Sequence, residues 1–312
     1  MMVQDSRPEQ RAQLTPLQRF LSSHLVTGLG MFLSKYAPPF MGHGIAGLIA
    51  GLINWSRPDV YWIAHANLRQ VVGPQVDDVA LHRLVRQVFR NTARNNYDLW
   101  RVVSQGHKAL RAVVHLPPAT WNCIEQAQRR GKGMILVGTH TGNFNLALLA
   151  LAAHGLEVQV LGLAIPPTGG FDLMDQMRAD IGVHLTSISV PTLRQAMRRL
   201  RAGGAVATGV DRPVGGAGPP VEFFGRLAPL PTGHVRLALK TDAAILVAGP
   251  YRDAQGRTVV PLSPPLEMVR TGDAEEDLRV NLRRVTARLE EYIRARPEQW
   301  AMFTPVWPEQ QL

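Results

Sequence analysis

From residue 111 onward, short apolar runs alternate with longer amphipathic stretches, and this alternation constrains the fold more than any other feature of the chain. Apolar runs of strand length occupy 112–114, 134–137, 158–163 and 205–210. Stretches of helical length lie between and beside them, at 121–130, 144–153, 171–181 and 191–201. Such alternation is typical of strand–helix–strand units. The sequence therefore predicts an α/β fold with a mostly parallel central sheet flanked by helices.

The two ends of the chain follow a different pattern. Residues 16–106 are predicted to be helical, because apolar side chains recur at helical spacing, for example at Leu81, Val85 and Phe89. A final helix is marked by an apolar face that consists of Leu278, Leu282, Val285, Leu289 and Ile293. We therefore expect an N-terminal helical, membrane-associating region, 1–106, and an α/β core, 107–312, that forms one continuous catalytic domain.

A histidine stands where one of the predicted strands passes into a helix. The sequence Gly-Thr-His-Thr-Gly-Asn-Phe-Asn at 138–145 joins the apolar run 134–137 to the next helix. In a parallel sheet such a junction lies at the carboxyl edge, where α/β proteins bind ligands and where a helix N-terminus offers free N–H groups to an anion. His140 is therefore a candidate for acid–base chemistry. The alternative is that it only caps the helix.

Four blocks in this order make the chain similar to a known family. They are the His140 block, Arg178-x-x-x-Gly182, Asp211-Arg212 followed by Phe223-Phe224-Gly225, and the tail Pro297-Glu298-Gln299-Trp300. Together they resemble the bacterial lysophospholipid-acyltransferase-like superfamily, in the branch of late lipid A acyltransferases and phosphatidylinositol mannoside acyltransferases. The resemblance covers most of the chain, from Asn67 to Trp300.

The resemblance implies an enzyme that moves a fatty acyl group from acyl carrier protein or coenzyme A to a hydroxyl of a glycolipid or lysophospholipid. His140 is then the general base, and the acceptor attacks the donor thioester directly. A covalent acyl-enzyme is disfavoured because no Gly-x-Ser-x-Gly elbow is present and the single cysteine, Cys123, lies in a predicted helix. No cofactor is expected apart from the acyl donor as co-substrate.

The family blocks also imply which residues bind substrate, namely Asn143, Arg178, Arg212, Phe223, Phe224 and Gly225. A guanidinium such as that of Arg178 offers a fixed fork of donors to a donor phosphate or to the reacting carbonyl. Each assignment has an alternative: a helix-surface ion pair for Arg178, ordinary core packing for the two phenylalanines, and a helix cap for Asn143.

One position departs from the family pattern, in which an acidic residue follows the histidine after four residues. This chain has Asn145 there. An amide can orient an imidazole through a hydrogen bond, but it supplies no negative charge to favour the imidazolium. Either Asp211 or Glu222 supplies the carboxylate instead, or the protein is a catalytically silent lipid-binding relative. Thioesterase-like hydrolysis is a third, weaker reading.

The formal net charge of +10 favours a polyanionic partner. Nucleic acid is not expected, because no zinc-finger, RNP-like or lysine-rich motif is present. Two apolar segments, 25–33 and 44–53, are too short to span a bilayer, and glycine, proline and charged or histidine residues interrupt them. We therefore predict interfacial helices at 16–55 on an anionic membrane surface, with Trp55, Tyr61 and Trp62 as anchors. The alternative is packing of these helices on the core.

The expected location is the cytoplasmic face of the bacterial plasma membrane, with a peripheral or monotopic attachment. Metal binding is not expected, because the ten histidines include no His-Glu-x-x-His motif and one cysteine cannot form a Cys-x-x-Cys pair.

Overall fold

The computed structural model describes residues 32, 34, 36, 38–105, 107–162, 182–214 and 219–307. Its centre is a five-stranded sheet in which all neighbours are parallel, in the order β4–β3–β5–β2–β8. These strands are β2 (Met134–Gly138), β3 (Val158–Gly162), β4 (Val183–Ser187), β5 (Ala205–Gly209) and β8 (Ala244–Ala248). The predicted α/β fold with a mostly parallel central sheet is confirmed.

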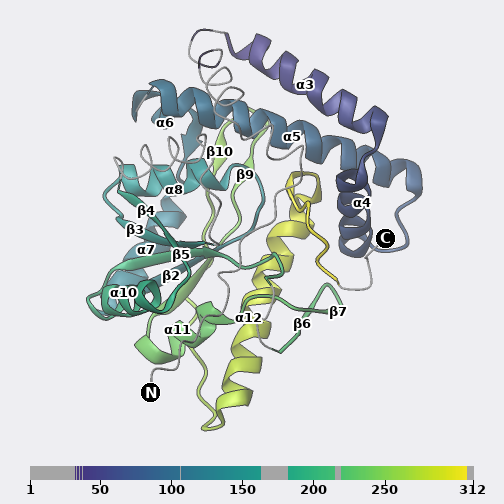
Figure 1. Ribbon diagram of the computed structural model, residues 1–312. Coiled ribbons are helices and arrows are strands. Elements are labelled where there is room, and N and C mark those ends of the chain that lie inside the picture. Colours follow the sequence, from purple (N-terminus) through teal and green to yellow (C-terminus); the bar gives the residue numbers. More distant parts are fainter. Residues whose placement is uncertain are drawn as a thin grey trace, which may run out of the picture.

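Helices cover both faces of this sheet (Figure 1). Because side chains alternate along a strand, Ile135 and Val137 of β2 pack toward α10 (Val190–Arg201), α11 (Gly233–Thr241) and α12 (Ala274–Ala295). Met134 and Leu136 pack on the opposite face toward α7 (Pro118–Arg129) and α8 (Phe144–Ala153). A strand buried on both faces needs apolar side chains at successive positions, which explains the uninterrupted run at 134–137.

Two smaller sheets border the central one. The first has the order β1–β10–β9 and consists of β1 (Val114–His115), β10 (Thr258–Val259) and β9 (Tyr251–Arg252). The second is the hairpin of β6 (Val221–Phe223) and β7 (Arg226–Ala228). The prediction that a strand begins at residue 112 is wrong, because α6 (His107–Val113) continues through Val113 and β1 begins at Val114. Leu110 and Val113, three residues apart, pack in the same cluster, as one helical face allows.

The N-terminal region consists, where it is described, of α3 (Pro39–Ser56), α4 (Asp59–Val72) and α5 (Asp78–Gln105). Helix α3 lies along the outer side of α5, away from the central sheet (Figure 1). The contact is close because Gly42 has no side chain: a Cβ there would lie 2.0 Å from Tyr97 Cε2. The face of α3 that turns away from α5 exposes Phe40, Met41, Ile45, Leu48, Ile49, Leu52 and Trp55.

Only part of the predicted membrane-facing surface is exposed. Trp55 is 82% and Trp62 37% exposed, but Tyr61 is only 1% exposed and stacks on Phe89 with ring centroids 6.1 Å apart. The prediction that Tyr61 is a surface anchor is therefore wrong. Within the described ranges, no helix combines the length and the apolar character that crossing a bilayer requires. Residues 16–31 and the helix predicted at 171–181 lie outside the described residues.

Candidate active site

His140 lies in the turn between β2 and α8, and the C-terminal segment of the chain holds this turn from one side. The His140 carbonyl accepts a hydrogen bond of 2.9 Å from the N–H of Ala301, and Thr141 forms an antiparallel bridge with Trp300. The N–H of Gly142 donates to the carbonyl of Gln299 at 3.1 Å. The backbone next to the histidine is thus paired like the edge of a sheet.

The carboxylate of Asp211 contacts both the side chain and the backbone of His140. Asp211 follows β5, and β5 pairs with β2 so that Gly138 and Gly209 lie opposite each other. The Nδ1 of His140 lies 2.6 Å from Asp211 Oδ1, and the His140 N–H donates to Asp211 Oδ2 at 2.7 Å. Trp300 donates from its indole Nε1 to the same Oδ2 at 2.8 Å. Asp211 is 0% exposed, so these neighbours, and not bulk water, solvate its carboxylate.

These contacts keep Asp211 ionised. Burial alone raises the pKa of this carboxyl group. The charge and hydrogen bonds of His140, together with the bond from Trp300, outweigh burial and lower the Asp211 pKa below its usual value. Because an ionised carboxylate can only accept hydrogen bonds, the proton between the two side chains lies on His140 Nδ1. The other ring nitrogen, Nε2, is then the basic one and is available to a substrate.

Gly209, at the end of β5, lies directly under the His140 imidazole. A Cβ at Gly209 would lie 3.0 Å from His140 Cε1 and 3.5 Å from Nε2. With a side chain at residue 209 the ring would have to shift by a few tenths of an ångström, so the glycine lets the ring lie close over β5. On its other side the ring meets Phe144 edge-on, with centroids 5.1 Å apart.

A cavity of about 400 Å³ opens beside His140. One face of α8 supplies Phe144, Ala147, Leu148 and Leu151 to its wall, and the facing strands β3 and β4 supply Val160, Val183 and Leu185. Polar side chains of His140, Asn145 and Arg212 lie among the lining residues. Mostly apolar walls with a few polar groups suit a ligand that combines an acyl chain with a polar reacting end.

One known protein family matches this chain. The bacterial lipid A biosynthesis acyltransferase family matches residues 8–309, which is nearly the whole chain. The chain belongs to this family. Family membership makes it an acyltransferase of lipid biosynthesis and confirms the resemblance that the four sequence blocks indicate.

Similar proteins come from mycobacteria. The phosphatidylinositol mannoside acyltransferase of Mycolicibacterium smegmatis is 24% identical to this acyltransferase over 287 residues, which cover 89% of each chain. The protein of the same name from Mycobacterium tuberculosis is 24% identical over 228 residues, which cover 72% of this chain and 67% of its own.

Three of the residues that the sequence assigns to the site of this acyltransferase lie around its turn. Asn145 lines the cavity from the first turn of α8. Arg212 lines it from the segment after β5 and forms no ion pair with any acidic side chain of the described residues. Asn143 caps α8: its Oδ1 accepts from the N–H of Leu146 at 3.3 Å. The roles of Asn143 and Arg212 in substrate binding and of Asn145 in catalysis stay predictions.

The remaining candidates lie elsewhere. Glu222 is exposed, and its carboxylate lies 3.3 Å from the Arg283 guanidinium, so the structure does not bring it to His140. Phe223 and Phe224 are buried and pack with Trp300 and Trp307. They support the tryptophan that binds Asp211 and are absent from the cavity wall.

Gly225 lies in the turn between β6 and β7. Gly225 adopts φ 77° after Phe224 at φ 51°, and two positive φ values are typical of a tight hairpin turn. Arg178 lies outside the described residues. In the part of the chain that the structure describes, no three His, Cys, Asp or Glu side chains group closely enough to hold a metal ion.

The sequence reasoning missed the role of Trp300. It used this tryptophan only as the end of the tail block, whereas the structure places its indole against Asp211. Nothing in the local sequence indicates this contact, which spans 89 residues. The signal that was available is the order of the blocks, since a tail block that accompanies the histidine block suggests a shared site.

Proposed function

We propose that this protein transfers a fatty acyl group from acyl-coenzyme A or acyl carrier protein to a hydroxyl of a glycolipid or lysophospholipid, with His140 as general base. The observation that carries the proposal is the buried Asp211 at 2.6 Å from His140 Nδ1, next to an apolar cavity. A carboxylate on Nδ1 fixes the tautomer in which Nε2 accepts a proton, and it stabilises the imidazolium that forms.

The reaction can be written with these groups alone. Nε2 of His140 accepts the proton of the acceptor hydroxyl while the hydroxyl oxygen attacks the thioester carbonyl carbon. The tetrahedral intermediate then collapses, the C–S bond breaks, and the imidazolium returns the proton to the leaving thiolate. Among the described residues, Arg212 is the arginine on the cavity wall. We assign to its guanidinium the stabilisation of the negative charge that develops on the carbonyl oxygen, or the binding of a phosphate of the donor.

The cavity supports the assignment of an acyl chain to this site. Phe144, Ala147, Leu148 and Leu151 follow the spacing of one helical face, and they line the cavity along about two turns of α8. Two turns correspond to a length of about 11 Å. An extended acyl chain laid along this face starts at the His140 end of the helix, where its carbonyl meets the base.

The exposed face of α3 supports attachment to a membrane. Its apolar side chains include Leu48 and Leu52, and Trp55 stands at the end of the helix. The next residue after the helix, Arg57, places its guanidinium 5.9 Å from the centre of the Trp62 ring. Apolar side chains beside arginine and tryptophan suit the interface of a bilayer with anionic headgroups. We assign this surface to the cytoplasmic face of the plasma membrane.

The position of Asp211 also favours an active enzyme over a silent lipid-binding protein. The absence of the family carboxylate at Asn145 would remove the partner of His140 if no other acid replaced it. Asp211 contacts the imidazole instead, so His140 has a carboxylate partner although residue 145 is an asparagine.

The test is an assay for acyl transfer. Purified protein is incubated with labelled acyl-coenzyme A or acyl carrier protein, detergent and a total bacterial lipid extract, and the label is followed by mass spectrometry. We expect label in a lipid, its loss in His140→Ala, and its retention in His115→Ala, which alters an exposed histidine of β1. Turnover in His140→Ala equal to the wild type would contradict the role of the base. Release of free fatty acid alone would favour hydrolysis. Bound lipid without turnover would favour a catalytically silent lipid-binding protein.

A further inference from the structure

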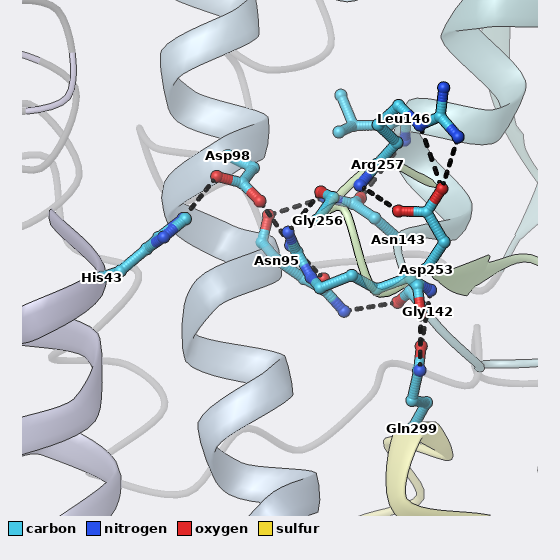
Figure 2. A network of polar contacts seen from close by, with 11 residues as sticks. His43, Asn95, Asp98, Gly142, Asn143, Leu146, Asp253, Gly256, Arg257 and Gln299 are labelled. Carbon is cyan, nitrogen blue, oxygen red and sulfur yellow. Dashed lines mark hydrogen bonds and ion pairs between the residues drawn. The ribbon is translucent and has the colours of Figure 1, made fainter. Parts of the chain in front are cut away.

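Asn95, a residue of α5 outside all the sequence blocks, makes two contacts with the active-site turn. Its Nδ2 donates to the carbonyl of Gly142 at 2.7 Å, and its own backbone carbonyl accepts from Asn143 Nδ2 at 2.7 Å. Asn95 is 8% exposed. Figure 2 shows this side chain between α5 and the turn, with its amide directed at Gly142.

Arg252 fixes which way the Asn95 amide faces. The Nη2 of Arg252 donates to Asn95 Oδ1 at 2.8 Å. Because a guanidinium has donors and no acceptor, only the oxygen of the amide can face it. The nitrogen must then face Gly142, and its two hydrogens can serve only an acceptor such as the Gly142 carbonyl.

Arg252 is itself held at both its side chain and its backbone. Its guanidinium pairs with the carboxylate of Asp98, and both side chains are about nine-tenths buried. Gln299 bonds the Arg252 backbone twice: the Arg252 N–H donates to Gln299 Oε1 at 2.7 Å, and Gln299 Nε2 donates to the Arg252 carbonyl at 3.0 Å. His43 of α3 contacts the other oxygen of Asp98 at 2.9 Å, so the network reaches the N-terminal helices (Figure 2).

The turn itself has little freedom to move without these bonds breaking. Gly142 adopts φ 52°, and a Cβ there would lie 2.5 Å from the carbonyl oxygen of Pro250. Its N–H is bonded to Gln299 and its carbonyl to Asn95. The peptide groups on both sides of a glycine, the residue with the widest choice of conformations, are therefore fixed from outside the turn.

We propose that Asn95 is a positioning residue, whose amide donor holds the Gly142 carbonyl so that His140 stays against Asp211 and α8 starts in the right place. The inference rests on the proposed function in that His140 is the base. Asn95 does not touch the cavity, and it acts through the backbone two residues after the histidine.

The deciding variant is Asn95→Asp. An aspartate keeps the size of the side chain and the oxygen that faces Arg252, but it replaces the donor to Gly142 with an acceptor. We expect kcat to fall about 10- to 100-fold, as misplacement by about 1 Å does in other enzymes, while KM for the acyl donor changes less than about twofold. Asn95→Ala is expected to lower kcat at least as much.

Asn91→Asp is the matched control. Asn91 lies one turn earlier on α5, and its Nδ2 donates to the carbonyl of Glu298 at 2.9 Å. The same substitution there removes a side-chain to backbone bond of the same kind, but this bond goes to the C-terminal segment and not to the turn. We expect kcat within about twofold of the wild type.

A second measurement does not depend on activity. Hydrogen–deuterium exchange of the peptide that contains residues 138–147 should speed up in Asn95→Asp and stay at the wild-type rate in Asn91→Asp, because local opening follows the loss of the bonds that hold a segment. If the wild-type protein shows no acyl transfer, the proposed function fails, while the exchange rates still decide whether Asn95 holds the turn.

Two results would overturn the inference. One is an unchanged exchange rate in Asn95→Asp. The other is a normal kcat in Asn95→Asp together with a reduced one in Asn95→Ala, because the residue would then serve only to fill space and to bind Arg252.

Discussion

At the scale of single residues, the carboxylate that contacts His140 does not come from the sequence position where the family pattern has it. Asn145 lines the cavity five residues after His140, whereas the acid on the imidazole is Asp211, which follows the neighbouring strand β5.

Since the pKa of Asp211 is lowered in the fold, the contribution of its carboxylate to stability is fully present above about pH 4, the usual pKa of an aspartate. This contribution is lost as the pH falls through the lower pKa of the folded state. The Asp211 carboxyl group is therefore ionised at neutral pH.

This arrangement predicts opposite results for two substitutions. Asp211→Asn should lower kcat by roughly 10⁴, as the comparable change does in a serine protease, because the imidazole loses its charge partner and its tautomer. Asn145→Asp should change kcat less than about threefold, since the place on Nδ1 is already taken. Steady-state kinetics of the acyl-transfer assay measure both.

Glu222→Gln serves as the control for these variants, because Glu222 pairs with Arg283 at 3.3 Å and has no contact with His140. It should behave as the wild type. A strong activation of Asn145→Asp, or a loss of activity in Glu222→Gln, would contradict the assignment of Asp211.

At the scale of elements, α8 is apolar on all sides beyond its first turn, because one side packs on α5 and α6 and another lines the cavity. Leu146, Leu149 and Ala150 pack in a cluster with α5 and α6, while Ala147 and Leu148 face the cavity. A helix with no polar face is expected to be buried all round. The side that lines the cavity is the one assigned here to the acyl chain.

Enlarging a side chain on that face should shorten the preferred acyl chain. Ala147→Phe fills part of the cavity wall, so we expect the ratio of kcat/KM for a long donor to that for a short one to fall at least about tenfold. Competition between donors of different length, read by mass spectrometry, measures the ratio. Val190→Phe, at an exposed position at the start of α10, should leave the preference unchanged, and an unchanged preference in Ala147→Phe would remove the acyl chain from this cavity.

At the scale of the whole molecule, the apolar face of α3 lies outside the compact core, and the chain carries a net charge of +10. Gly42 lets α3 approach α5 closely, and only the side that faces α5 is buried. A contiguous apolar surface on one element of a protein usually marks an interaction site. For the membrane attachment proposed above, the positive net charge of the chain favours a bilayer with anionic lipids.

Acidic residues on this face should therefore weaken binding to vesicles. For Leu48→Glu combined with Leu52→Glu we expect at least about a tenfold loss of binding to phosphatidylglycerol vesicles, because burial of one leucine contributes about 1.5–3 kcal/mol. Co-sedimentation of the purified protein with the vesicles measures it. Leu227→Glu alters a leucine of β7 that is also exposed, and it should bind like the wild type. The same loss of binding free energy per added negative charge in both proteins would mean that net charge alone drives the binding.

The sequence by itself determined the class of fold, the family, and the place of His140 at the end of a strand, because these depend on local periodicity and on short motifs. It left open whether Asp211 or Glu222 supplies the acid. Only the tertiary structure decided that β5 pairs with β2, which brings Asp211 to His140 across 71 residues. It also decided that Trp300 contacts Asp211, that Asn95 contacts the turn after His140, and that Phe223 belongs to the core. The physical reason is that an apolar run shows that a strand is buried, but the neighbour of that strand is set by the packing of the whole chain.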